Sequence, residues 1–332
     1  MTYSHYIALD WSKENMAIAI LSEGQKRPKV EDVKSDIRQL KRRLINLDGP
    51  KILTFEETTS SRWLHRQVKD LVDRVLVCDP YKNHLLTSGA KTDKLDAEKL
   101  ALLLKADCLS EVYQPDAKVA ELRTLISGYE DLIKRGVRAK NQRSAVLMAA
   151  GLDADTEAAD ESSRFVLSGL ENTIEQYELE RKRYYKEFER LAKKFTLVRW
   201  LTEIPGIGVI GAVKIYAIVG DGARFKHRNN FLAYSGLVRL EKLSGGRSYG
   251  SRKPRSRRAL KAVFKTAALA AIAHDGSFND YYHYLITEKR YPDHQARHAV
   301  ARKIATAVYG VMKNKKKYDF SQLGALRNLS QA

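Results

Sequence analysis

A heptad-spaced apolar stripe restricts the fold of this chain more than any other feature of its sequence. Apolar residues recur at alternating intervals of three and four, with Arg181 in one position of the stripe, at Leu167, Leu170, Ile174, Tyr177, Tyr184, Phe188, Leu191 and Phe195. This spacing predicts one helix of roughly 30 residues, about 45 Å long at 1.5 Å per residue. Because a small domain cannot bury so long a helix by itself, the sequence predicts a helical partner for it.

Two partners fit the stripe. One is an intramolecular hairpin with a second helix, which the pattern predicts at about residues 118–148. The other is a neighbouring protomer in a homo-oligomer, either a dimer or a tetramer. In both cases the long helix separates two working ends. The sequence therefore predicts an α/β domain at 1–115, a helical coiled-coil connector and oligomerisation region at 116–197, and a mainly α-helical basic domain at 198–332.

Short apolar runs alternate with helical patterns in the first 110 residues. Strand-like runs are YIALDWS, MAIAIL, KILTFEE and RVLVCDP, and helices are expected at about 30–47 and 61–71. The first two runs are close enough in sequence for a hairpin, whereas intervening helices favour parallel pairing of the later strands through crossovers. We therefore expect a mixed sheet with flanking helices.

Positive charge is concentrated in the second part of the chain. Residues 199–332 carry 25 Lys and Arg against 8 Asp and Glu, whereas residues 1–198 carry 34 against 32. The densest run, residues 247–265, has eight basic residues and no acid. Phosphate backbones bind such surfaces with release of counterions, so a nucleic acid is the expected partner. The predicted nucleic-acid-binding residues are Lys242, Arg247, Arg252, Lys253, Arg255, Arg257, Arg258 and Lys261.

Several classes of protein are disfavoured by the composition. Cys78 and Cys108 are the only cysteines and have no paired spacing, which argues against a disulfide framework and against a cysteine-based zinc site. The first residues lack the pattern of a signal peptide, and no apolar run reaches the roughly 20 residues that span a bilayer. We expect a cytoplasmic protein with no membrane partner.

Carboxylates stand at the ends of the predicted elements. Asp10 ends the first strand, Glu56 and Glu57 end the KILTF strand, and Asp93 and Asp96 are three apart on one helical face. Metal-assisted phosphoryl transfer needs such acids to converge from different elements. Each has an ordinary alternative, as a turn residue or as an acid in the first turn of a helix. Their order along the chain is that of RNase H-like nucleases. Because side chains alternate between the two faces of a strand, the sequence alone does not decide whether Glu56 or Glu57 is the second acid.

With these residues in place, the chain resembles the DEDD transposases of the insertion sequence 110 family. The resemblance rests on Asp10 in IALDWS, on the block KTDKLDAEKLA around Asp93 and Asp96, and on PGIG at 205–208, which starts the family's C-terminal domain. It implies that residues 1–115 form a RuvC-like RNase H-fold catalytic domain. The metal expected there is Mg²⁺, with Mn²⁺ as the alternative.

The same resemblance selects the second acid. In the family this acid precedes one residue, then Thr-Gly and an aromatic a few positions later. That register places Glu57 before Thr58 and Thr59, with Trp63 as the aromatic, and Ser60 stands where the family has glycine. The implied catalytic and metal-binding acids are thus Asp10, Glu57, Asp93 and Asp96.

A nucleophilic serine is also implied, in a Ser-Gly motif downstream of a Tyr-x-Gly-Leu stretch. Here the stretch is residues 234–237, and the serine is Ser244, followed by two glycines. Glycines allow a phosphate to approach closely, and the neighbouring Lys242 and Arg247 can stabilise developing charge. Without the family, Ser244 would be interpreted as a turn residue. The family's Lys-x-Gly-Asn segment is replaced here by KPRS at residues 253–256.

The implied function is that of an insertion-sequence transposase. It would cut and rejoin target and donor DNA through a covalent phosphoserine intermediate, guided by a structured non-coding RNA, the bridge RNA, that pairs with both DNAs. Base pairing would then carry the sequence information while the protein supplies charge and shape. Two alternatives stay open. One is a RuvC-like, Mg²⁺-dependent junction endonuclease that uses water, and the other is a non-catalytic RNA- or DNA-binding protein.

Overall fold

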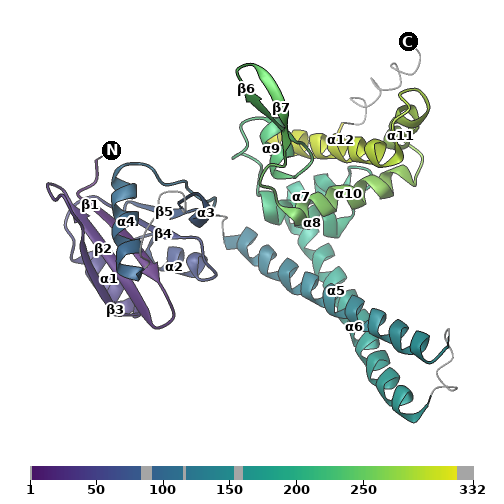
Figure 1. Cartoon of the computed structure of the whole chain (residues 1–332), viewed down its shortest axis with the longest axis horizontal. Helices are drawn as coiled ribbons and strands as arrows, with labels where there is room; N and C mark the ends of the chain where they lie inside the picture. Colours follow the sequence, from purple (N-terminus) through teal and green to yellow (C-terminus); the bar gives the residue numbers. More distant parts are fainter. Residues whose placement is uncertain (1, 84–91, 115–116, 153–159, 320–332) are drawn as a thin grey trace. The chain divides into compact units, whose positions relative to one another are not determined.

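The computed structural model describes residues 2–83, 92–114, 117–152 and 160–319 (Figure 1). Contacts divide the chain into two compact units, Met1–Gln114 and Pro115–Ala332. Helices within the described ranges are either too short or too polar to cross a membrane. The division at residue 197 that the sequence predicts lies inside the second unit and stays a prediction.

A five-stranded mixed sheet forms the centre of the first unit. Its strands are β1 (His5–Trp11), β2 (Asn15–Ser22), β3 (Lys29–Lys34), β4 (Lys51–Glu56) and β5 (Arg74–Cys78), in the order β3-β2-β1-β4-β5. The first three strands pair antiparallel, and β4 and β5 continue the sheet in parallel with β1. The predicted mixed sheet, with an early hairpin and later crossovers, is therefore confirmed.

The helix expected at residues 30–47 is wrong in its first third, where the chain forms β3. Val30 pairs with Ala19 and Val33 with Met16, so the two valines lie on opposite faces and join different cores. This pairing satisfies the backbone groups along the outer edge of β2, which a helix would leave without partners. Helix α1 (Ile37–Ile45) starts only after Asp36, whose carboxylate accepts a 2.8 Å hydrogen bond from the amide of Arg38.

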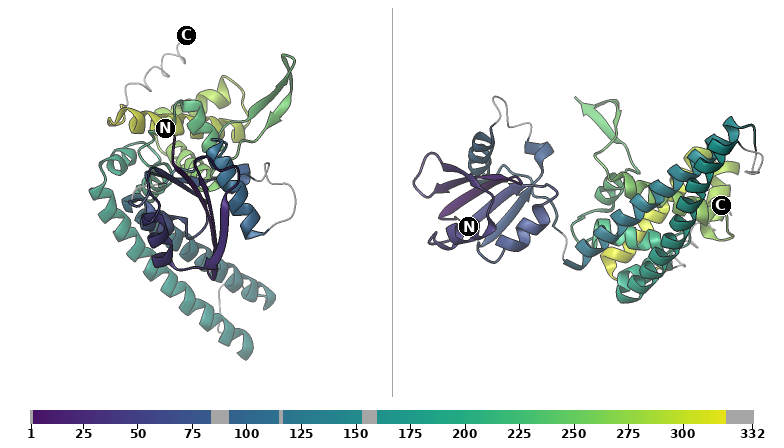
Figure 2. Two further views of the ribbon diagram at one scale, coloured as in Figure 1. Left: turned by 90° about the vertical axis from the view of Figure 1, so that its left-hand side faces the viewer. Right: turned by 90° about the horizontal axis from the view of Figure 1, so that it is seen from below.

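Helices cover both faces of the sheet (Figures 1 and 2). Ile7 and Leu9 of β1 join the core formed with α1 and α2 (Ser61–Val68), whereas Ala8 joins the core formed with α4 (Asp93–Lys105). This follows from the two-residue period of a strand. Even-numbered side chains of β1 therefore face α4, and Asp10 continues that series. A short helix, α3 (Pro80–Asn83), follows β5.

A long helical hairpin begins the second unit. Helices α5 (Ala117–Ala149) and α6 (Glu161–Lys194) run side by side (Figure 2). The ring of Phe188 stands edge-on to Tyr129, 5.2 Å between centroids, and Leu167 packs against Leu147. Gly136 admits Tyr177, since a Cβ there would lie 2.3 Å from that ring. The heptad stripe thus packs against α5 of the same chain, with Leu167, Tyr177 and Phe188 buried, which confirms the intramolecular partner. Assembly with another protomer stays a prediction.

The remaining helices pack on the base of this hairpin. They are α7 (Thr196–Thr202), α8 (Val209–Val219), α9 (Arg228–Tyr234), α10 (Arg258–Ile272), α11 (Ser277–Thr287) and α12 (Asp293–Asn314). Phe188 of α6 shares one core with Phe231 and Phe264, so the connector and the basic region are packed together. An antiparallel hairpin, β6 (Leu240–Ser244) and β7 (Arg247–Arg252), projects beyond α9 and α12 (Figure 1).

The PGIG turn brings α10 against the connection between α7 and α8. Gly206 has φ of +84°, and a Cβ there would lie 2.1 Å from the carbonyl oxygen of Ala267. Only glycine tolerates both the conformation and this approach. In this structure the turn therefore acts as a packing element between helices.

Candidate active site

The carboxyl ends of β1 and β4 position two of the acids. The strands are parallel with Leu9 opposite Phe55, so the next residues, Asp10 and Glu56, are neighbours on the face that α4 covers. Glu56 is partly buried, whereas Glu57 is exposed and follows on the alternate side of the chain. The backbone amide of Glu57 donates to the carbonyl oxygen of Cys78, 3.0 Å away.

The first turn of α4 carries the other two acids. Thr92 caps this helix, because its hydroxyl accepts a 3.3 Å hydrogen bond from the amide of Leu95. The amide of Asp96 donates to the carbonyl oxygen of Thr92 at 2.9 Å. Ala97 is fully buried against the sheet, which holds the turn in place, while Asp96 is partly buried and Asp93 exposed.

Three other carboxylates act on the pKa of Asp10. Burial first, and then the negative charges of Asp93, Asp96 and Glu56, together raise the pKa of Asp10 from 3.8 to about 6. Glu57 is not among the residues whose charge raises the pKa of Asp10. Asp93 and Asp96 of the predicted set therefore lie near enough to Asp10 to affect its charge, and so does Glu56, while a metal site formed by these acids stays a prediction. Glu57 stays a prediction from motif register.

Neutral groups lie next to these acids. Cys78 pairs with Glu56 across β5 and β4, and burial raises the pKa of its thiol to about 11. Asn83, 2% exposed, donates from Nδ2 to the sulfur of Cys78 at 3.1 Å. The rings of Trp11 and Trp63 lie 5.5 Å apart, centroid to centroid, beside the end of β1. Sequence reasoning missed Asn83, because nothing in its segment distinguishes it from a loop amide.

The donor set suits a hard divalent cation. Carboxylate oxygens are the ligands that Mg²⁺ and Mn²⁺ prefer, and a cation would relieve the mutual repulsion that raises the pKa of Asp10. Across the described ranges, no three His, Cys, Asp or Glu side chains are gathered closely enough to form a ready metal site. The carboxylates near Asp10 are therefore of the right chemical type to bind such an ion, but their side chains are too far apart to form a closed site.

Ser244 lies at the tip of the β6–β7 hairpin. It pairs with Arg247, and the two turn residues Gly245 and Gly246 have φ of +55° and +76°, as a two-residue hairpin turn requires. All residues of both strands are exposed. The Ser244 hydroxyl is therefore accessible to a large substrate, with the Arg247 guanidinium carried by the paired residue.

The predicted basic residues continue from this hairpin into α10. Lys242 lies on β6, Arg247 and Arg252 on β7, and the rest on the connecting segment and the first turns of α10; these are Lys253, Arg255, Arg257, Arg258 and Lys261. Arg257 donates from Nε to the Tyr234 hydroxyl at 3.1 Å. Burial by itself would raise the pKa of Tyr234, but Arg224 and Arg257 outweigh it and lower the pKa below its ordinary value.

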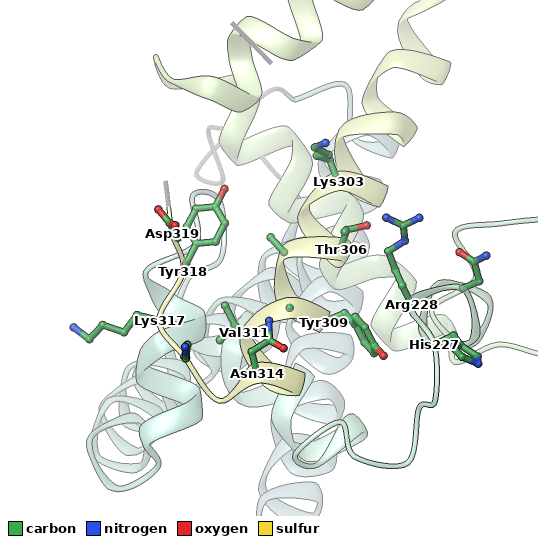
Figure 3. Close-up of a pocket in the computed structure, with 14 residues that line it drawn as sticks. His227, Arg228, Lys303, Thr306, Tyr309, Val311, Asn314, Lys317, Tyr318 and Asp319 are labelled. Carbon is green, nitrogen blue, oxygen red and sulfur yellow. The ribbon is translucent and has the colours of Figure 1, made fainter. Parts of the chain in front are cut away.

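Further basic residues line a cavity of about 800 Å³ between α9 and α12 (Figure 3). His227 and Arg228 come from the start of α9, Lys303 from α12, and Lys317 from the segment that follows α12. Sequence reasoning missed this basic cavity, because the contributing residues lie far apart in the chain and meet only through helix packing.

Comparisons with known proteins cover all of the predicted catalytic residues. Residues 7–150 match the model of DEDD transposases of the IS110 type, described as "Transposase", and residues 198–283 match "Transposase IS116/IS110/IS902 family". The chain is 26% identical over 220 residues to "Transposase for insertion sequence element IS1328" of Yersinia enterocolitica, which covers 60% of this chain and 64% of that protein.

A second relative comes from Streptomyces coelicolor. It is the "Insertion element IS110 uncharacterized 43.6 kDa protein", 29% identical over 118 residues, which cover 35% of this chain and 29% of the relative. In both cases the chain spans less than two thirds of the length of the relative that it matches.

Proposed function

This chain belongs to the IS110 family of DEDD transposases, and from that premise we propose that it cuts and rejoins the DNA strands of an insertion sequence. The observation that carries the proposal is the position of Asp10 at the end of β1, where burial and the charges of Asp93, Asp96 and Glu56 raise its pKa to about 6. Perturbed carboxyls gathered at strand ends are typical of catalytic sites. The strand order β3-β2-β1-β4-β5 supports the proposal of a RuvC-like fold.

The first half of the proposed site binds a divalent metal, as is typical of DEDD transposases, and we assign Mg²⁺ with Mn²⁺ as the alternative. Asp10, Asp93 and Asp96 would hold it, together with Glu56 on geometric grounds or Glu57 on motif register. Bound there, the ion supplies charge compensation for the scissile phosphate. Above a pH of about 6, Asp10 is ionised and available as a ligand.

The second half of the proposed site is Ser244. Its hydroxyl oxygen attacks the scissile phosphorus, the bond from phosphorus to the 3′-oxygen breaks, and that oxygen leaves with a proton as a 3′-hydroxyl. A DNA 3′-hydroxyl then attacks the phosphoserine, which restores the serine and joins the strands. Arg247, paired with Ser244, and the nearby Lys242 counter the charge that develops on the phosphate oxygens.

Sequence selection is assigned to RNA. The cations of residues 247–265 suit phosphate backbones and carry no base-reading pattern. We propose that a structured non-coding bridge RNA pairs with target and donor DNA, and that a homo-oligomer of this chain, acting in the bacterial cytoplasm, positions the strands. Exposed apolar residues on the helical hairpin, such as Val137 and Leu179, support such an assembly.

Covalent trapping tests the proposal. The purified chain is mixed with DNA of the element's ends, RNA transcribed from the flanking non-coding stretch, and Mg²⁺, and denaturing electrophoresis then detects protein–DNA adducts. Wild type and Ser248→Ala should form the adduct, and Ser244→Ala should not. Ser248 is the matched control, because it is an exposed serine of the same hairpin.

Each contrary outcome selects another function. An adduct formed by Ser244→Ala refutes the nucleophile. Strand cleavage that survives in Ser244→Ala but is lost in Asp10→Ala indicates hydrolysis by water, as in a RuvC-like endonuclease. Transposition unaffected by Asp93→Asn combined with Asp96→Asn indicates a non-catalytic nucleic-acid-binding protein.

A further inference from the structure

A second basic cavity, of about 430 Å³, lies at the base of the β6–β7 hairpin. Its polar lining comes from four parts of the chain: Arg239 before β6, Lys253 and Ser256 after β7, Lys261 on α10, and His298 and Arg302 on α12. The sequence run at 247–265 anticipates Lys253 and Lys261 but neither Arg239 nor the α12 residues. The cavity therefore joins cations that only the fold brings together.

Negative charge is almost absent around this cavity. No acid is among the lining residues, Glu241 is the only acid between Asp221 and Asp275, and α12 has none after Asp293. Within the described ranges, none of Arg239, Lys253, Lys261 and Arg302 forms an ion pair with a carboxylate. Several cations around one concave site, without internal counter-charge, favour an external anion.

Part of the cavity is already ordered for binding. Arg239 donates from Nε to the Ser251 hydroxyl at 2.7 Å and from Nη2 to the Ser251 carbonyl oxygen at 3.2 Å, which ties the guanidinium across the base of the hairpin. Gly236 has φ of +68°, and a Cβ there would lie 2.8 Å from the Ser256 hydroxyl, so Ser256 packs closely on the backbone. Preorganised groups lose little entropy when a ligand binds.

His298 adds a neutral donor to these cations. Burial lowers its pKa, and the charges of Arg302, Lys261 and Lys265, which face it from α12 and α10, lower it further. At neutral pH the imidazole therefore carries one N–H that can donate to an anionic oxygen. The combination of guanidinium, ammonium, hydroxyl and imidazole donors matches a phosphate group.

We propose that this cavity binds one backbone phosphate of the DNA strand that Ser244 attacks. The position along the strand rests on the proposed function of Ser244. Strand β6 takes four steps of about 3.4 Å from Leu240, beside the cavity, to Ser244, which is roughly 14 Å, and B-DNA advances about 3.4 Å per nucleotide. The bound phosphate thus lies about four nucleotides from the scissile one, and the cavity fixes the hairpin on its substrate.

Salt-dependent binding tests the site independently of catalysis. A labelled mixed-sequence DNA duplex is titrated by fluorescence anisotropy with Ser244→Ala protein, alone and combined with Lys261→Ala and Arg302→Ala. The logarithm of affinity falls as the logarithm of the salt concentration rises, and loss of one phosphate contact should make this slope shallower by about 0.9. The parent should then lose about 3-fold more affinity than the variant between about 50 and 200 mM salt.

Two matched variants separate this site from general charge. Lys289→Ala with Arg297→Ala removes two cations of the same region that do not line the cavity, and should leave the slope unchanged. Lys261→Arg with Arg302→Lys keeps both charges and should retain the parental slope, which attributes the change in the alanine variant to the lost charge. Equal slope changes in the cavity pair and in the Lys289 and Arg297 pair refute a specific site.

Parallel measurements with different ligands identify the source of the phosphate. On DNA of the element's end, single neutral methylphosphonate linkages are placed in turn, and binding by the parent should weaken at one position about four nucleotides from the cleavage point. The cavity variant should show no such position. A slope change that the cavity variant shows only with an RNA duplex overturns the DNA assignment. If inorganic phosphate occupies the cavity of the parent and DNA binding does not change, the cavity is a site for free anions. An adduct formed by Ser244→Ala, by contrast, contradicts the nucleophile and the position along the strand that was counted from it, while the changed salt dependence of the cavity variant would still show phosphate binding.

Discussion

Replacing Asp10 with asparagine should stabilise the first unit while abolishing strand transfer. In the folded chain the pKa of Asp10 is raised from 3.8 to about 6 by burial and by Asp93, Asp96 and Glu56, so its ionised form is disfavoured there. A raised carboxyl pKa contributes stability below a pH of about 4, and this contribution is lost as the pH rises through about 6. Asparagine resembles the neutral acid at every pH.

The magnitude follows from the shift. Two pKa units correspond to about 3 kcal/mol, and because Asp10 is only half buried, solvent screening reduces the expected effect to about 1 to 2 kcal/mol. The free energy of unfolding of Asp10→Asn should therefore equal that of wild type near a pH of about 4, exceed it increasingly up to a pH of about 6, and hold a constant excess above about 7.

Urea unfolding followed by tryptophan fluorescence measures this difference. Trp11 and Trp63 lie in the first unit and Trp200 in the second, so a Trp200→Phe background makes the signal report on the first unit. Glu57→Gln is the matched control, because Glu57 is exposed and does not contribute to the raised pKa of Asp10. Addition of Mg²⁺ should stabilise wild type more than Asp10→Asn and so reduce the gap.

A stability difference that is independent of pH would falsify this reasoning, because burial and the neighbouring carboxylates would then not raise the pKa of Asp10 in the folded chain. So would an equal pH-dependent gain in Glu57→Gln.

Two further predictions concern the second acid and the PGIG turn. Glu56→Gln should reduce strand cleavage by 100-fold or more, on the order of the loss for removal of an electrostatic catalytic group, whereas Glu57→Gln should retain most activity. A loss confined to Glu57→Gln would instead support the motif register. Gly206→Ala should lower the free energy of unfolding of the second unit by about 2 kcal/mol or more, since it combines a positive φ with a clash at Ala267. Circular dichroism in urea measures this, and an unchanged unfolding midpoint would show that the turn adapts.

Much of the architecture was predictable because it depends on local periodicity. The heptad stripe from Leu167 to Phe195 predicted the long helix, and alternating apolar runs predicted the sheet strands. Asp93 and Asp96 were placed on one helical face by their spacing, and Asp10 at a strand end by the run before it. These features need only the backbone period and a capping residue, which neighbouring positions in the sequence supply.

The tertiary structure determined those features that depend on contacts between segments far apart in the chain. Residues 29–34 form a strand because β2 offers an edge to pair with, and the buried partner of α6 is α5. Register between β1 and β4 places Glu56 beside Asp10, a choice that two adjacent glutamates in sequence leave open. Arg302 joins Lys261 at one cavity only because α12 packs against α10. Periodicity is a property of one segment, whereas register and packing are set by the free energy of contacts between segments, which no single segment encodes.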